Sequence, residues 1–186
     1  GAATLYTKEY FELVKQHLNP GGLVTQWVPL YESNEAAVKS EIATFFSVFP
    51  NGTIWGNTNQ GQGYDLVLLG QVEPLKIDID AIQARLAAPN MGQAELSMST
   101  VGFYSVVDLL ATYAGRASDL KPWLADAQIN LDRNLRLQYL AGMTPDQYKG
   151  GPIYNAILSY RRFPADLITG TPTELAQLAT GMGLYR

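Results

Sequence analysis

The stretch that decides the fold is "LVTQWVPLY", Leu23 to Tyr31. It reads as a short, mostly apolar strand, yet it ends in Gln26 and Trp27 and leads directly to Tyr31. In α/β sheets, ligands bind beyond the carboxyl ends of the strands. The stretch therefore predicts a strand end that faces a ligand crevice. The alternative is a sheet edge in which Trp27 packs and Gln26 satisfies a neighbouring loop.

A helix is expected before this strand. Thr7 is placed to cap it, and "NPGG", residues 19–22, ends it because Pro and Gly do not continue a helix comfortably. The helix should bury one apolar stripe at the spacing i, i+3, i+4, i+7, i+8. That stripe consists of Tyr10, Leu13, Val14, His17 and Leu18.

A second helix is expected after the strand, capped by Asn34 or Ser33 and stopped by Pro50. Its inward side chains should be Ala37, Val38, Ile42, Phe45, Phe46 and Phe49. Two further strands, "TIWG" and "YDLVLLG", are joined by a polar loop over residues 57–63. This order of elements predicts an α/β fold.

After Pro74 the pattern changes to a series of short helices. "TPDQ", residues 144–147, and "TPTE", residues 171–174, each place Thr at the N-cap, Pro at the first helical position and Gln or Glu at the third. Further helices are expected around residues 101–113 and 152–160, and Asp80 is expected to cap another.

The composition excludes several classes of function. A net charge of -4 gives no support for nucleic-acid binding, which needs clustered Lys and Arg. The chain has no Cys and one His, which argues against thiolate chemistry, metal sites and Ser/His/Asp catalysis. No complete nucleotide-binding fingerprint is found, because "GQG", residues 61–63, leads into a strand and not into a helix.

The segment "LYTKEYFELVKQHLNPGGLVTQWVPLYESNEAAVKSEIATFFSVFPNGTIW", residues 5–55, resembles the later half of the catalytic domain of the spermidine/spermine synthase family. The resemblance is greatest to the fused bacterial spermidine synthase-like proteins. It rests on the L-Y-T helix start, the P-G-G turn, the Q-W-x-P-L-Y strand end and the F-x-x-V-F-P helix end. "YDLVLLG" fits the final strand, and "PLKIDIDAIQARL" fits the helical extension that follows.

The resemblance implies the C-terminal part of a Rossmann-like, methyltransferase-type domain over residues 1–75 and a mainly helical extension over residues 76–186. It implies transfer of an aminopropyl group from decarboxylated S-adenosylmethionine to a polyamine acceptor, without a metal. The family's glycine-rich turn and catalytic Asp lie upstream of the L-Y-T helix, so no catalytic residue is expected here. The expected partners are the N-terminal half of the domain and a second copy of the chain.

Five residues are expected to bind substrate. The resemblance places Gln26, Trp27 and Tyr31 on the amine side. A second, weaker match at "INLDRNLRLQYLAG", residues 129–142, adds Asn130 and Asp132. In this segment the family has an acidic residue where this chain has Arg133 and a proline where it has Leu135.

Two other readings stay open at this stage. One is a methyltransferase-like protein that uses intact S-adenosylmethionine, and the other is a non-catalytic binding or assembly domain. The absence of Cys fits a reducing compartment, and the expected location is the cytoplasmic face, with a possible tether from an upstream membrane region.

Overall fold

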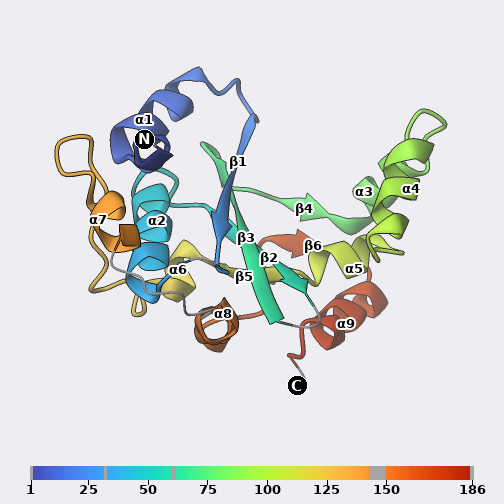
Figure 1. Ribbon diagram of the computed structural model, residues 1–186. Helices are drawn as coiled ribbons and strands as arrows, with labels where there is room; N and C mark the ends of the chain where they lie inside the picture. Colours follow the sequence, from blue (N-terminus) through green and yellow to red (C-terminus); the bar gives the residue numbers. More distant parts are fainter. Residues whose placement is uncertain (1, 32, 60–61, 143–149, 185–186) are drawn as a thin grey trace. The chain divides into compact units, whose positions relative to one another are not determined.

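The computed structural model describes residues 2–31, 33–59, 62–142 and 150–184 (Figure 1). The chain forms two compact units, each built from two segments. The first unit consists of residues 1–74 and 114–161, and the second of residues 75–113 and 162–186. The first segment of the first unit ends at Pro74, and residues 114–161 return to that unit.

A four-stranded sheet with the order β1-β3-β2-β5 forms the centre of the first unit (Figure 1). Its strands are β1 (Leu23–Pro29), β2 (Thr53–Asn59), β3 (Gln62–Gln71) and β5 (Tyr113–Arg116). β3 runs antiparallel to both β1 and β2, so β1 and β2 run in the same direction. The fold is therefore mixed α/β, and β1 lies at one edge of the sheet.

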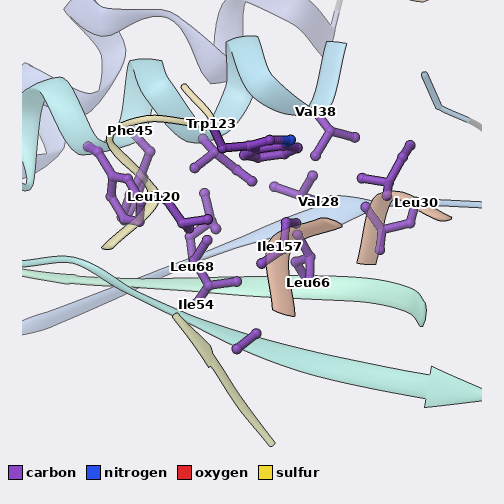
Figure 2. Packing of buried hydrophobic residues seen from close by; sticks show 14 of the residues in the cluster. Val28, Leu30, Val38, Phe45, Ile54, Leu66, Leu68, Leu120, Trp123 and Ile157 are labelled. Carbon is purple, nitrogen blue, oxygen red and sulfur yellow. The ribbon is translucent and has the colours of Figure 1, made fainter. Parts of the chain in front are cut away.

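One face of this sheet packs against α2. α2 (Glu35–Val48) begins at Asn34, whose side chain accepts a hydrogen bond from the Ala37 N–H at 2.9 Å. Every side chain predicted to point inward from this helix and its C-cap is buried. Figure 2 shows Val38 and Phe45 of α2 packing toward Val28, Leu66 and Leu68 of the sheet.

The first helix packs Tyr10, Val14 and Leu18 of the expected stripe against the core and adds Phe11 to them. α1 (Lys8–His17) begins at the predicted cap, Thr7, which accepts from the Tyr10 N–H at 3.3 Å. Phe11 is its buried residue and packs edge-on against Phe45 at 5.2 Å between ring centroids. Leu13 and His17, which were both predicted to point inward, are exposed. The helix is anchored by Phe11, which was not part of the predicted stripe.

The remaining helices of the first unit complete its core. They are η1 (Ala2–Tyr6), a 3-10 helix, and α6 (Ala117–Leu120), α7 (Arg136–Gly142) and α8 (Gly150–Ser159). Tyr154 of α8 fits against two strand glycines: a Cβ on Gly56 or Gly63 would lie 2.2 Å from its side-chain atoms. Glycine is required at both positions for this close approach.

The second unit contains β4 (Ile77–Asp78), α3 (Ile79–Leu86), α4 (Gly92–Thr100), α5 (Val106–Leu110), β6 (Ile168–Thr169) and α9 (Pro172–Gly181). Thr171 and Glu174 form the predicted capping box. Asp78, not Asp80, caps α3, because its carboxylate lies within 2.8 Å of the Ala81 N–H.

The expected helix over 101–113 is wrong in length. Only α5 is helical there, and β5 begins at Tyr113. The predicted cap at 144–147 lies outside the described residues. Within the described ranges, no helix has both the length and the apolar character needed to cross a membrane.

Replacing Gly70 by Ala should destabilise the first unit. The added Cβ would lie 2.7–2.9 Å from ring atoms of Phe45 and Phe49, which the packed core cannot move aside cheaply. The expected loss of unfolding free energy is about 1–3 kcal/mol, measured by urea unfolding followed by circular dichroism. Gly92→Ala in α4, where nothing lies within 4 Å of the added atom, is the control and should be neutral or slightly stabilising. Equal stability of the two variants would contradict the packing argument.

Candidate functional site

The outer edge of β1 carries the features of a site. Leu30 donates its N–H to the Tyr64 carbonyl at 3.0 Å, which continues the β1–β3 register. In an antiparallel pair, alternate residues bond to the partner strand and those between them point away. Thr25 and Trp27 therefore direct their main-chain groups to the open edge. Among the described residues, β1 pairs only with β3.

The side chains of Gln26 and Trp27 lie on opposite faces of the sheet. Successive residues of a strand alternate between the two faces. Gln26 shares its face with the buried Val28, which packs under α2, whereas Trp27 points to the other face and is 45% exposed. The two residues predicted to line one crevice thus contribute to two adjacent groups.

The first group is polar and is centred on the Trp27 main-chain carbonyl. This oxygen accepts hydrogen bonds from the Tyr6 hydroxyl and from the Gln26 side-chain Nε2, each at 3.2 Å. Both hydrogen bonds are exposed to solvent. η1, which ends at Tyr6, therefore reaches the edge of β1 at this point.

Glu41 of α2 is a buried carboxyl group. One turn before it, Ala37 belongs to a small cluster against which Tyr6 packs, and one turn after it, Phe45 packs against Phe11, so Glu41 belongs to the same face of the helix. It is only 8% exposed, and its Oε2 has no hydrogen-bond partner. Burial raises the pKa of Glu41 to about 8. The pKa of Tyr6 is raised by burial and, to a smaller extent, by the charge of Glu41.

The second group is aromatic and lies where β1 ends. Tyr31 stacks on Tyr64, with ring centroids 4.6 Å apart and an interplanar angle of 16°. The ring centroids of Trp27 and Tyr31 lie 6.4 Å apart. The structure thus brings Tyr31 next to Trp27, and Tyr64 extends the row.

Asn130 is a structural anchor. It is fully buried, and its Nδ2 donates to the carbonyls of Ala3 and Tyr6 at 2.9 and 3.0 Å. Its Oδ1 accepts from the Leu137 N–H at 3.0 Å, and its main-chain N–H donates to Thr44 Oγ1 at 2.9 Å. These bonds leave its amide engaged with the fold, so Asn130 supports the site indirectly, by holding η1 and hence Tyr6.

Asp132 is not drawn into either group. It is exposed, and its main-chain N–H donates to Glu9 Oε2 at 3.0 Å. Three residues on, Leu135 adopts a φ of 42°, the only positive φ at a non-glycine position in the described ranges. A proline has a fixed φ near −65°. The backbone at Leu135 therefore has a conformation that a proline at this position would not permit.

Sequence reasoning did not identify Tyr6, Glu41 or Tyr64. Tyr6 and Glu41 both lie in the segment over residues 5–55, but a Glu between the inward positions of a helix is usually expected to be solvated. The only signal for Glu41 was its position four residues after the inward Ala37 and four before the inward Phe45.

The described residues contain no group of three or more His, Asp or Glu side chains placed to hold a metal ion. Comparisons of the chain with family models, with curated proteins and with solved structures give no match. The case for function therefore rests on the sequence resemblance and on the geometry above.

Replacing Asn130 by Asp should strongly lower the unfolding free energy of the first unit. The substitution keeps the shape but turns the donating Nδ2 into an oxygen that faces two carbonyl oxygens in a buried site. The expected cost is about 3 kcal/mol, measured by urea unfolding. Tryptophan fluorescence is a suitable signal, since Trp27, Trp55 and Trp123 all belong to the first unit. Asp132→Asn, an exposed change nearby, should alter stability by less than about 0.5 kcal/mol. A similar small effect at Asn130 would show that it does not anchor η1.

Replacing Glu41 by Gln should stabilise the protein at neutral pH. Because the folded pKa of about 8 exceeds the ordinary value of 4.5, the folded state holds a proton that the unfolded state releases between these pH values. Stability is thus lost as the pH rises from 4.5 to 8 and then levels off, a penalty of about 3 kcal/mol at pH 7. Glu41→Gln removes this penalty. The unfolding free energy of the variant should therefore exceed that of wild type by a margin that grows as the pH rises over that range. Glu12→Gln, on the exposed face of α1, is the control. Parallel pH profiles for wild type and Glu41→Gln would contradict the assignment.

Proposed function

We propose that this chain forms the amine side of a spermidine synthase-like active site. In this proposal the complete enzyme transfers an aminopropyl group from decarboxylated S-adenosylmethionine to a polyamine acceptor. Gln26, Trp27 and Tyr31 lie at the substrate end of β1. Asn130 acts by holding Tyr6 in place, and the exposed Asp132 bonds through its main chain to Glu9.

The observation that carries the proposal is the strand order of the sheet. β1 and β2 are parallel, and β3, the last of the three along the chain, lies antiparallel between them. A final antiparallel strand inserted between two parallel ones is how a methyltransferase-type sheet ends. The order leaves β1 at an open edge, where a parallel strand from a preceding segment would pair. This arrangement supports a Rossmann-like sheet of which the chain supplies one side.

The chemistry at the end of β1 suits an amine. Trp27, Tyr31 and Tyr64 offer aromatic faces, which attract ammonium groups and pack against the methylene chain between them. The Trp27 carbonyl and the Tyr6 hydroxyl offer oxygen acceptors to N–H groups. In the proposal the donor site and the general base come from another segment or subunit, and a homo-oligomer on the cytoplasmic side completes the assembly.

A methyltransferase-like protein that uses intact S-adenosylmethionine is the second candidate. The same strand order favours it equally, because the sheet type does not fix the group that is transferred. The two functions differ in the bond that is broken at the sulfonium, and therefore in the product.

The test uses the protein as its own cell makes it, with its intact mass and N-terminal sequence determined first. It is incubated with 1,4-diaminobutane and either donor, and the products are identified by mass spectrometry. The expected product is aminopropylated diamine, formed with the decarboxylated donor. Its rate of formation should fall at least tenfold in Trp27→Ala, because a contact to the amine is lost. Thr58→Ala, an exposed change on β2, is the control. A methylated product would favour the second candidate, and no product from either donor would favour a binding or assembly domain.

A further inference from the structure

Asp65 of β3 is a buried carboxyl group with few partners. Its side chain is only 7% exposed, and its Oδ1 has no hydrogen-bond partner. Its Oδ2 accepts one long hydrogen bond, from Asn57 Nδ2 at 3.4 Å. Among the described residues, no Lys or Arg forms an ion pair with it. Burying a carboxyl group with so little compensation is costly, so folding alone gives no reason for an Asp at this position.

The strand register places Asp65 beside the aromatic rings at the end of β1. Its Cα partner on β1 is Pro29, which lies midway between Trp27 and Tyr31 along the chain. Paired residues of two strands share a face of the sheet, and diagonal neighbours lie within about 8 Å of each other. Trp27 is such a diagonal neighbour of Asp65. The ring centroid of Tyr31 lies 6.4 Å from that of Trp27, so the two rings meet on the side of the sheet to which Asp65 points.

A bulge in β3 brings a third ring to the same place. The β2 partner of Asp65 is Asn57. The next residue of β2 pairs with Gly63, so Tyr64 has no partner on that strand. An extra residue of this kind re-aims its side chain, and such bulges are common next to functional sites. Here the Tyr64 ring stacks on that of Tyr31, with 4.6 Å between the centroids.

The position is one at which ligands bind in α/β sheets, beyond the carboxyl ends of the parallel strands. Asp65 lies opposite Pro29, the last residue of β1, and opposite Asn57 near the end of β2. Trp27 and Asn57 are both exposed, so a ligand can approach the carboxyl group from either side. These groups are side chains on one face of the sheet. A ligand among them therefore leaves the main-chain edge of β1 free to pair with another strand.

The combination of one carboxyl group and several rings selects the chemical class of the ligand. An ammonium group is a compact donor of three hydrogens, and it neutralises a carboxylate with which it bonds. Aromatic faces attract the same cation and pack against an alkyl chain. An anion would meet like charge at Asp65. The arrangement therefore suits an ammonium group carried on an apolar chain.

We infer that Asp65 binds the ammonium group at the unreacting end of the acceptor, with the rings of Trp27, Tyr31 and Tyr64 beside it. This inference rests on the proposed function for the identity of the ligand as an aliphatic diamine. The attacking amine must lose a proton to free its lone pair, whereas the amino group at the other end keeps its charge and needs a counter-ion. Asp65 supplies that counter-ion and takes no part in bond formation.

Binding of 1,4-diaminobutane, measured by calorimetry on the complete protein without donor, tests the inference. Asp65→Asn removes the charge and keeps the shape, so it should weaken binding at least tenfold. Asp65→Glu, which keeps the charge on a longer side chain, should bind with an affinity between those of wild type and Asp65→Asn. Asp126→Asn, an exposed change in a surface pair with Lys39, is the matched control and should bind as wild type does. 1,4-Butanediol, which has the same length without charge, should not bind.

Urea unfolding of the same variants separates a binding role from a structural one. If Asp65 only supported the bulge, Asp65→Asn would lose stability and binding together. The inference requires instead that the urea midpoint of Asp65→Asn does not fall while its affinity for the diamine does. Wild-type affinity in Asp65→Asn, or no binding of the diamine to wild type, would overturn the inference.

The transfer assay distinguishes this inference from the proposed function. Transfer that is unaffected by Asp65→Asn leaves the proposed function and removes the inference. Binding that depends on Asp65, without transfer from either donor, leaves a diamine-binding site and removes the proposed function.

Discussion

The hydrogen bonds of Asn130 are the constraint on which the first unit depends. This one side chain joins the carbonyls of Ala3 and Tyr6 to the start of α7, and its main chain bonds to Thr44 of α2 and to the N–H of Lys8. Because residue 130 is far along the chain from all but one of these partners, the N-terminal segment is held in place by a segment that follows the sheet. Removing the anchor would free η1, and the Tyr6 hydroxyl would no longer be fixed at the edge of β1.

Asn130 and Glu41 show two opposite uses of burial. Asn130 is fully buried, and its donors and acceptor are matched by partners, so its burial fixes the geometry at little net cost. Glu41 is nearly as buried but keeps an unmatched oxygen, which lowers stability at neutral pH. This unfavourable burial persists because α2 is packed rigidly, since a loosely packed helix would turn the carboxyl group toward solvent. Thr44, to which Asn130 bonds, lies three residues after Glu41 and therefore on the same side of α2, so the anchor holds the helix close to the unsatisfied group.

The sequence predicts local structure well where a single residue decides it. Thr7, Asn34 and Thr171 cap their helices as expected, because each cap needs only an acceptor next to free N–H groups. The stripe of α1 fails at Leu13, since two adjacent apolar stripes fit its pattern and the contact between Phe11 and Phe45 decides between them. The roles of Asn130 and Glu41 depend on partners distant in the sequence. A motif resemblance marks Asn130 without distinguishing a ligand contact from an anchor, and the helical spacing of Glu41 to Ala37 and Phe45 indicates burial but not a role.

The separation of Gln26 from Trp27 also follows from elementary geometry, and it changes how the end of β1 works. Adjacent residues of a strand cannot line one pocket with their side chains, because they point to opposite faces. What they share is the peptide unit between them, and its carbonyl is the atom on which Tyr6 and Gln26 converge. An extended diamine has a cation at each end and methylenes between. The aromatic row of Trp27, Tyr31 and Tyr64 matches the methylenes and one cation of such a ligand. Because that row is made by side chains on one face of the sheet, a ligand held there leaves the main-chain edge of β1 free for the parallel strand that the proposed sheet requires.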